Sequence, residues 1–127
     1  MYKILYRDVV CCQTEKPAMR PIAWMGSAFD DLLGFPEEIR REAGYQLHRL
    51  QAGLEAADWK PISEIGKGVA EIRLRGDTGA YRIIYLARYE DAVYVLHCFK
   101  KKTQRTSGHD KYIAKARFQA VLDARRG

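Results

Sequence analysis

The sequence predicts an α+β domain in which helices pack on one face of a small twisted antiparallel sheet of three or four strands. Apolar residues recur at helical spacing between residues 35 and 54, whereas from Val69 onward the apolar period changes to two, which is typical of strands. A chain of 127 residues with 47% apolar residues can bury one hydrophobic core. We therefore expect a single domain over residues 21–127, preceded by an N-terminal arm over residues 1–20.

The expected arm shows no clear apolar period, and Pro17 and Pro21 lie at its end. The stretch YKILY can form a short strand, and Met19 offers an alternative start of the chain. The apolar stretch IAWM that follows is bounded by Pro21 and Gly26, which predicts a brief strand.

The first half of the domain predicts a helical hairpin. Ser27 followed by Asp30 resembles a capping box, which opens a short helix to about Leu33. A second helix begins near Pro36, has two glutamates in its first turn, and stops at Gly53. Its expected apolar face comprises Phe35, Ile39, Ala43, Leu47, Leu50 and Leu54.

The second half predicts a three-stranded meander and a last helix. VAEIRLR alternates between apolar and charged residues, GDTG is a turn signal, and AYRIIYLARY is the expected antiparallel partner. After the turn YEDA, VYVLHCF is the most apolar strand, and we expect it to be central or covered on both faces. A helix over residues 107–124 carries an apolar stripe of Ala114, Phe118, Val121 and Leu122.

The basic charge is concentrated in the second half of the chain. Residues 1–59 carry 7 Lys and Arg against 9 Asp and Glu, a net charge of −2, whereas residues 60–127 carry 15 against 7, a net charge of +8. A one-sided basic surface attracts phosphate backbones. The same pattern fits a solvated face or a docking surface for an acidic protein.

Cysteine usage and hydropathy indicate a cytoplasmic protein. The three cysteines, Cys11, Cys12 and Cys98, are odd in number and lack zinc-ligand spacing, so we expect reduced thiols and no metal or other cofactor. No stretch approaches eighteen consecutive apolar residues, and no small-residue cleavage site follows the charged N-terminal segment. Neither a membrane span nor a secretory signal is therefore predicted.

Cationic side chains gather on the predicted strands. Glu71, Arg73 and Arg75 alternate onto the expected exposed face of the first long strand, and Arg82 follows on its partner across the turn. Three further cations leave the end of the third strand, namely Lys100, Lys101 and Lys102. Because unopposed cations repel one another, the cluster favours an anion-binding surface. Ion pairing with nearby carboxylates is the alternative for each single arginine.

The available residue types favour metal-free cleavage of RNA. The sequence contains no phosphate-binding glycine loop, no nucleophilic serine elbow and no carboxylate cluster for two-metal hydrolysis. What remains is Arg, Lys, Tyr, Glu and His, and the 2′-hydroxyl of RNA can itself supply the nucleophile. The protein must then accept a proton, stabilise the phosphorane and protonate the leaving 5′-oxygen.

Three motifs carry a resemblance to a known family. Glu-x-Arg at Glu71 and Arg73, Tyr-Arg-x-x-Tyr at residues 81–85, and VLHCFKKKTQRT occur in an order that resembles the phage-derived Gp49-like branch of the HigB/RelE toxins. The similarity covers about residues 16–122. It implies the RelE-like fold and a ribosome-dependent mRNA endonuclease, the toxin of a type II toxin–antitoxin system. It also implies an antitoxin partner with a helix-turn-helix domain, of the HigA type.

The resemblance also implies site residues. Arg82 matches the arginine that stabilises the scissile phosphate, and Arg73 a second basic residue of the site. Lys101 lies in the basic motif after the last strand. Some relatives carry a tyrosine or histidine near the C-terminus, for which Tyr112 is the first choice and His109 the second. Glu71 is either a base or the ion partner of the arginines. The residues expected to bind RNA are Arg75, Lys100, Lys102, Arg105 and His109.

Two other functions remain open on the sequence alone. The same fold can serve as a non-catalytic RNA- or ribosome-binding module, or as an inactive homologue that binds only the antitoxin. His97, on an apolar strand, is expected to be a core or edge histidine with its hydrogen bonds satisfied. Trp59 is expected to pack under the helices, with stacking on a base as the alternative.

Overall fold

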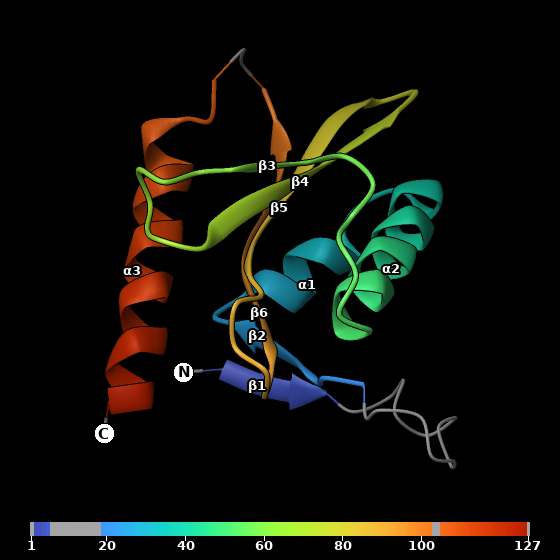
Figure 1. Ribbon diagram of the computed structural model, residues 1–127. Coiled ribbons are helices and arrows are strands. Elements are labelled where there is room, and N and C mark those ends of the chain that lie inside the picture. Colours follow the sequence, from blue (N-terminus) through green and yellow to red (C-terminus); the bar gives the residue numbers. More distant parts are fainter. Residues whose placement is uncertain (1, 6–18, 103–104, 127) are drawn as a thin grey trace.

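The computed structural model describes residues 2–5, 19–102 and 105–126. The strands and helices along the chain are β1 (Tyr2–Leu5), β2 (Ile22–Met25), α1 (Ala28–Leu33), α2 (Glu37–Gln51), β3 (Trp59–Pro61), β4 (Val69–Gly76), β5 (Gly79–Leu86), β6 (Val93–Lys101) and α3 (Gly108–Arg126). Figure 1 shows the strands as one twisted layer between α1 and α2 on one side and α3 on the other.

The sheet is larger than expected and is mixed. Its six strands follow the order β1-β2-β6-β5-β4-β3, and every neighbouring pair is antiparallel except β2 and β6, which run parallel. The prediction of three or four antiparallel strands was wrong because β1 and β3 contain four and three residues. The stretch of β1 was expected as a strand of the arm, and its pairing with β2 makes it part of the sheet. The three residues of β3 show no apolar period, and only their pairing with β4 reveals the strand.

The meander of β4, β5 and β6 is confirmed. Gly76 pairs with Gly79, so that Asp77 and Thr78 form the two-residue turn, and the φ of +138° at Gly79 lies in the range that favours glycine. The strand β6 lies between β2 and β5, and its residues from Val93 to Phe99 are all buried. Central placement of this strand, expected from its composition, is therefore confirmed.

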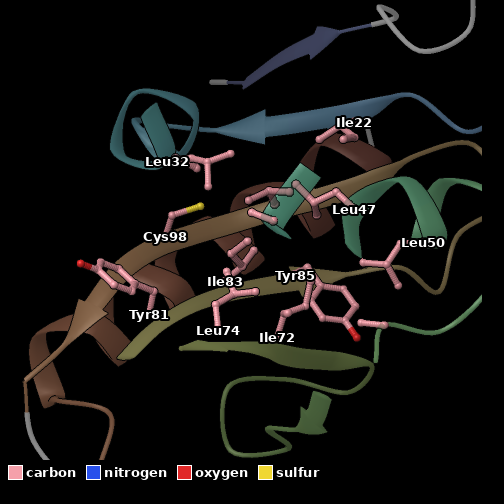
Figure 2. Packing of buried hydrophobic residues seen from close by; sticks show 14 of the residues in the cluster. Ile22, Leu32, Leu47, Leu50, Ile72, Leu74, Tyr81, Ile83, Tyr85 and Cys98 are labelled. Carbon is pink, nitrogen blue, oxygen red and sulfur yellow. The ribbon is translucent and has the colours of Figure 1, made fainter. Parts of the chain in front are cut away.

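The helices cover both faces of the sheet rather than one. One hydrophobic cluster joins α1 and α2 to residues such as Ile72, Ile83 and Cys98, and Figure 2 shows these side chains pointing into a common core. A second cluster joins Ala114 and Val121 of α3 to the alternate residues of the same strands. The prediction of a single covered face was wrong because the central strands are apolar on both faces, which leaves the side chosen by α3 undetermined in the sequence.

The two N-terminal helices are present, but they do not form the expected hairpin. The six-residue α1 packs on β6 and β2, whereas α2 packs on β4, so each helix meets the sheet separately. The capping box at Ser27 was also wrong, because its hydroxyl bonds the side chain of Asp31, 2.7 Å away, and makes no cap bond. The expected apolar face of α2 is buried except at Leu54, which lies beyond the helix and is 52% exposed.

The described residues of the expected arm are fixed to the rest of the fold. The expected short strand in YKILY is present as β1, which pairs with β2. The guanidinium of Arg20 donates hydrogen bonds to the carbonyls of Leu50, Ala87 and Tyr89 and so joins the end of α2 to the loop after β5. The remainder of the expected arm, residues 6–18, with Cys11 and Cys12, lies outside the described residues.

Candidate nucleic-acid interface

Strand pairing brings the charged residues of four strands together on the face covered by α3. Arg73 lies directly opposite Arg82, Glu71 opposite Lys60, and Lys101 opposite Ala80. Arg82 lies between Tyr81 and Ile83, which both face the other helices, so its own side chain points to the α3 face. Long cationic side chains from β3, β4, β5 and β6 therefore share one side of the sheet.

Three adjoining hollows surround these side chains. The first, here called the arginine hollow, has a volume of about 660 Å³ and is lined by Lys60, Glu71, Arg73, Arg75, Ala80, Arg82, Lys101 and Lys102. The loop hollow, about 380 Å³, extends from it toward residues 61–64 and 105–111. The helix hollow, about 470 Å³, lies between the end of β6 and the start of α3. Lys101 lines all three hollows, so they meet at this residue.

A buried carboxylate organises the arginine hollow. Oε2 of Glu71 lies 3.8 Å from Nε of Arg82 and 3.9 Å from Nε of Arg73, and Asp58 lies 4.0 Å from the same atom of Arg73. At these distances the groups form ion pairs, but they are too far apart for good hydrogen bonds. Among the described residues, Oε1 of Glu71 and the Nε atoms of Arg73 and Arg82 are buried without a hydrogen-bond partner. Unsatisfied buried donors of this kind are suited to an incoming anion.

Arg82 is the most buried cation of the hollow. Burial lowers the pKa of its guanidinium, Glu71 acts in the opposite direction, and the nearby Arg73 lowers it further. A guanidinium nevertheless stays protonated in proteins. Nη1 of Arg82 donates a hydrogen bond of 3.0 Å to the carbonyl of Tyr81, which fixes the plane of the side chain. The site thus presents a pre-oriented, partly desolvated positive charge.

Lys101 differs from an ordinary surface lysine. Desolvation lowers the pKa of its ammonium first, followed by repulsion from Arg82, while Glu71 partly opposes this shift. A lysine with a lowered pKa releases its proton more readily and can take part in proton transfer. The position of Lys101 at the junction of the three hollows places this group beside any ligand that spans them.

The structure groups most of the predicted site residues but separates two of them. Arg105 lines the loop and helix hollows, and His109 lines the helix hollow. The ammonium of Lys100 lies 5.9 Å from the ring centroid of Tyr81, on the face opposite Arg82, although the residue also contributes to the wall of the helix hollow. Tyr112 is 71% exposed and lines none of the three hollows.

The environment of Glu71 and Arg82 also differs from the prediction. Both were expected on an exposed strand face, yet each is 5% exposed. The reason is that α3 packs on this face of the sheet (Figure 1), and that β3 pairs with β4 at the edge and places Lys60 opposite Glu71. The two residues therefore lie at the base of the hollow, whereas Arg75 and Lys102 are exposed at its rim.

Sequence reasoning missed Lys60, Ser107 and Asp110. Lys60 belongs to β3, a strand that the sequence does not predict, and the only signal is the alternation in Trp-Lys-Pro. Ser107 caps α3, because the amide of Asp110 donates to the serine oxygen at 3.1 Å, and the serine hydroxyl donates in turn to the carboxylate of Asp110. The pattern S-x-x-D was present in the sequence and had been assigned only at Ser27.

His97 is a buried histidine whose ring bonds a carboxylate. Its Nε2 lies 2.7 Å from Oδ1 of Asp110, and its ring stacks on Phe99 with centroids 5.0 Å apart. Burial lowers the pKa of His97, and Asp110 opposes the shift. The prediction of a core histidine is confirmed, although its Nδ1 has no hydrogen-bond partner among the described residues.

Within residues 2–5, 19–102 and 105–126, His, Cys, Asp and Glu side chains form no group of three or more that could hold a metal ion. Within the same ranges, no helix combines the length and the apolar character needed to cross a membrane.

Comparison with known proteins gives one family. A family model described as phage derived protein Gp49-like matches residues 30–119, which include α2, the strands β3 to β6 and most of α3. No curated protein matches the chain. The matched segment contains all the residues that line the arginine hollow.

Proposed function

The chain belongs to the phage-derived Gp49-like family, a branch of the RelE/HigB-like toxins, and on that premise we propose that it is a ribosome-dependent mRNA endonuclease that acts without a metal ion. The protein would be the toxin component of a type II toxin–antitoxin pair. Cleavage of messages at the ribosome would halt translation and growth.

The observation that carries this proposal is the convergence of Arg73, Arg82 and Lys101 on one hollow around the buried Glu71. A phosphodiester carries one negative charge, and a phosphorane carries more. Guanidinium groups can donate two parallel hydrogen bonds to such an anion, and the burial of Arg82 strengthens them.

The proposed reaction uses the 2′-hydroxyl as the nucleophile. The 2′-oxygen forms a bond to phosphorus while its proton passes to a base, and the bond from phosphorus to the 5′-oxygen breaks. The products are a 2′,3′-cyclic phosphate and a 5′-hydroxyl, the latter having taken up a proton from an acid. Arg82 and Arg73 would stabilise the charge of the phosphorane, and Lys101, whose pKa is lowered, would supply the proton to the 5′-oxygen.

Glu71 would act mainly through the arginines. Its carboxylate lies within 4 Å of both guanidinium groups and compensates the buried charge of Arg82. A base role for Glu71 predicts that Glu71→Gln abolishes cleavage but preserves RNA binding, whereas an orienting role predicts that both are weakened. These outcomes separate the two roles without further structural work.

Membership of the family also supports an antitoxin partner. We propose a helix-turn-helix antitoxin of the HigA type, whose binding would cover the basic hollows. Co-expression of this chain with a small helix-turn-helix protein encoded beside it tests the proposal. The expected result is a stable complex that no longer cleaves RNA, and the absence of any such complex would contradict it.

The function itself is tested by induction of the chain in cells, followed by primer extension on ribosome-bound messages. The expected result is growth arrest together with new 5′-ends inside translated regions within minutes of induction. An RNA- or ribosome-binding module would inhibit translation without new ends. An inactive antitoxin-binding homologue would cause neither effect, and either of these results would overturn the endonuclease proposal.

A further inference from the structure

The helix hollow differs in character from the arginine hollow beside it. Its walls include Phe99 on β6 and three residues at the start of α3, namely Ser107, His109 and Asp110, together with the lysines and Arg105. An aromatic side chain and a carboxylate are poor partners for a phosphate group, since the first offers no charge and the second repels the anion. An aromatic or apolar surface beside polar groups is instead typical of a nucleobase site.

The carboxylate of Asp110 is held in place from two sides. Oδ1 lies 2.7 Å from Nε2 of His97, and Oδ2 accepts a hydrogen bond of 2.7 Å from the hydroxyl of Ser107. Burial lowers the pKa of His97, so near neutral pH the ring is uncharged and carries its proton on Nε2, where it can donate to the carboxylate. The orientation of Asp110 is therefore fixed before a ligand arrives.

The same carboxylate keeps the capacity to bind a ligand. An ionised carboxyl group has about four lone-pair positions, and the two hydrogen bonds to His97 and Ser107 occupy two of them. The side chain of Asp110 is 21% exposed, and it lines the hollow. A fixed, partly buried acceptor of this kind binds an amino group and disfavours a carbonyl oxygen at the same place.

The two hollows adjoin, because Lys101 and Lys102 line both. A strand whose phosphate lies against Arg82 can thus extend one nucleotide into the helix hollow. We propose that the helix hollow is a nucleobase subsite in which Asp110 selects a base with an exocyclic amino group, so that cytosine binds better than uracil. This inference rests on the proposed RNA substrate.

The test compares hexamers of cytidylate and uridylate that are methylated at every 2′-oxygen. Methylation removes the nucleophile, so binding is measured by fluorescence anisotropy whether or not the protein cleaves RNA. Cytosine and uracil have the same ring size but differ at two positions. Position 4 carries an amino group in cytosine and an oxygen in uracil, and N3 accepts a hydrogen bond in cytosine but donates one in uracil. The wild-type protein is expected to bind the cytidylate hexamer about 10-fold more tightly, a difference of about 1.4 kcal/mol.

Asp110→Asn is expected to bring the ratio of the two affinities close to one, because an amide offers both a donor and an acceptor. Asp123→Asn is the matched control, with the same chemical change at an exposed position near the other end of α3, and it should retain the wild-type ratio. A hexamer of 4-N,N-dimethylcytidylate changes only the ligand and should lose the advantage of cytidylate with the wild-type protein.

The dimethylated hexamer keeps the test decisive even if Asp110→Asn weakens the cap of α3. Equal binding of cytidylate and uridylate by the wild-type protein would overturn the subsite, as would full affinity for the dimethylated hexamer. A ratio unchanged in Asp110→Asn would show that the preference arises elsewhere. Failure of the endonuclease proposal is a separate result, since it is measured by new message ends and not by these affinities.

Discussion

Glu71 and Arg82 form a buried ion pair across neighbouring strands, with Oε2 and Nε separated by 3.8 Å and each side chain 6% exposed. The pair lies at the base of a hollow whose other charged walls are cationic. Arg73, opposite Arg82 in the sheet, shares the same carboxylate at 3.9 Å. Glu71 thus compensates both arginines, with Asp58 4.0 Å from Arg73 as a second acid. The lysines of the hollow leave a net positive charge that is available to an anion.

The first prediction concerns the stability of this pair. Glu71→Gln preserves the shape of the side chain but leaves Arg82 without its counter-charge, so the free energy of unfolding should fall by about 3 kcal/mol. Urea denaturation measures this as a lower midpoint with an unchanged slope. Glu37→Gln is the control, because Glu37 and its partner Arg41 are both exposed and the change should cost about 0.5 kcal/mol or less. A loss at Glu71 no greater than that of the control would show that the pair does not stabilise the fold.

A second prediction concerns the pH dependence of cleavage. If protonated Lys101 supplies the proton to the 5′-oxygen, single-turnover cleavage should decline as pH rises through the lowered pKa of Lys101. That decline should begin at a lower pH than the ordinary lysine value of 10.5 would give. Lys101→Arg, whose side chain stays protonated, should cleave more slowly and lose the early decline. The exposed Lys67→Arg should keep the wild-type profile, and an early decline that persists in Lys101→Arg would assign the acid to another group.

The number of phosphate contacts gives a third prediction. Arg75 is exposed at the rim of the arginine hollow, so it should bind the backbone without reading the sequence. Arg75→Ala should weaken the binding of all RNA sequences to a similar degree. It should also reduce the slope of log affinity against log salt concentration by about 0.7 for single-stranded RNA. The control Arg41→Ala removes the same charge from α2, outside the hollows, and should leave the slope unchanged. Equal slopes for the wild-type protein and both variants would show that Arg75 does not contact the RNA.

The burial of His97 leads to a prediction on acid stability. The pKa of His97 is lowered in the folded protein from its ordinary value of 6.5. As pH falls below 6.5, the histidine therefore takes up a proton in the unfolded chain before it does so in the folded protein. The free energy of unfolding should therefore decrease as pH falls from about 6.5 through the lower folded pKa. Urea midpoints between pH 7.5 and 5 should show this decrease in the wild-type protein and in the control His48→Gln, at an exposed position. His97→Gln should show a smaller decrease, and parallel curves for all three would contradict the assignment.

Local signals allowed part of the fold to be predicted. The turn GDTG and the alternation on both sides of it predict the hairpin of β4 and β5, and Gly53 marks the end of α2. The strand β3 could not be found in this way, since three residues give no period and its pairing with β4 is a tertiary contact. Lys60 was therefore missing from the predicted site, although it lies opposite Glu71.

The grouping of the cationic residues followed from the sequence, but the orientation of their side chains did not. Arg73, Arg82 and Lys101 do share one hollow, because cross-strand pairing follows from the turn. The three consecutive lysines were treated as one group, yet neighbouring residues of a strand point to opposite faces, and Lys100 lies over Tyr81 on the other side. The burial of Glu71 depends on the side of the sheet that α3 covers, which no local pattern specifies.

The most direct test of the central claim is the cleavage rate of Arg82 variants on messages bound to purified ribosomes. Arg82→Ala should lower the single-turnover rate by about 100- to 1,000-fold, the usual cost of removing one group that stabilises transition-state charge. Arg82→Lys keeps the charge that Glu71 compensates, so it controls for folding and should still lose at least about 10-fold. Arg40→Ala, exposed on α2, should cleave at the wild-type rate. Wild-type cleavage by a folded Arg82→Ala protein would contradict the account.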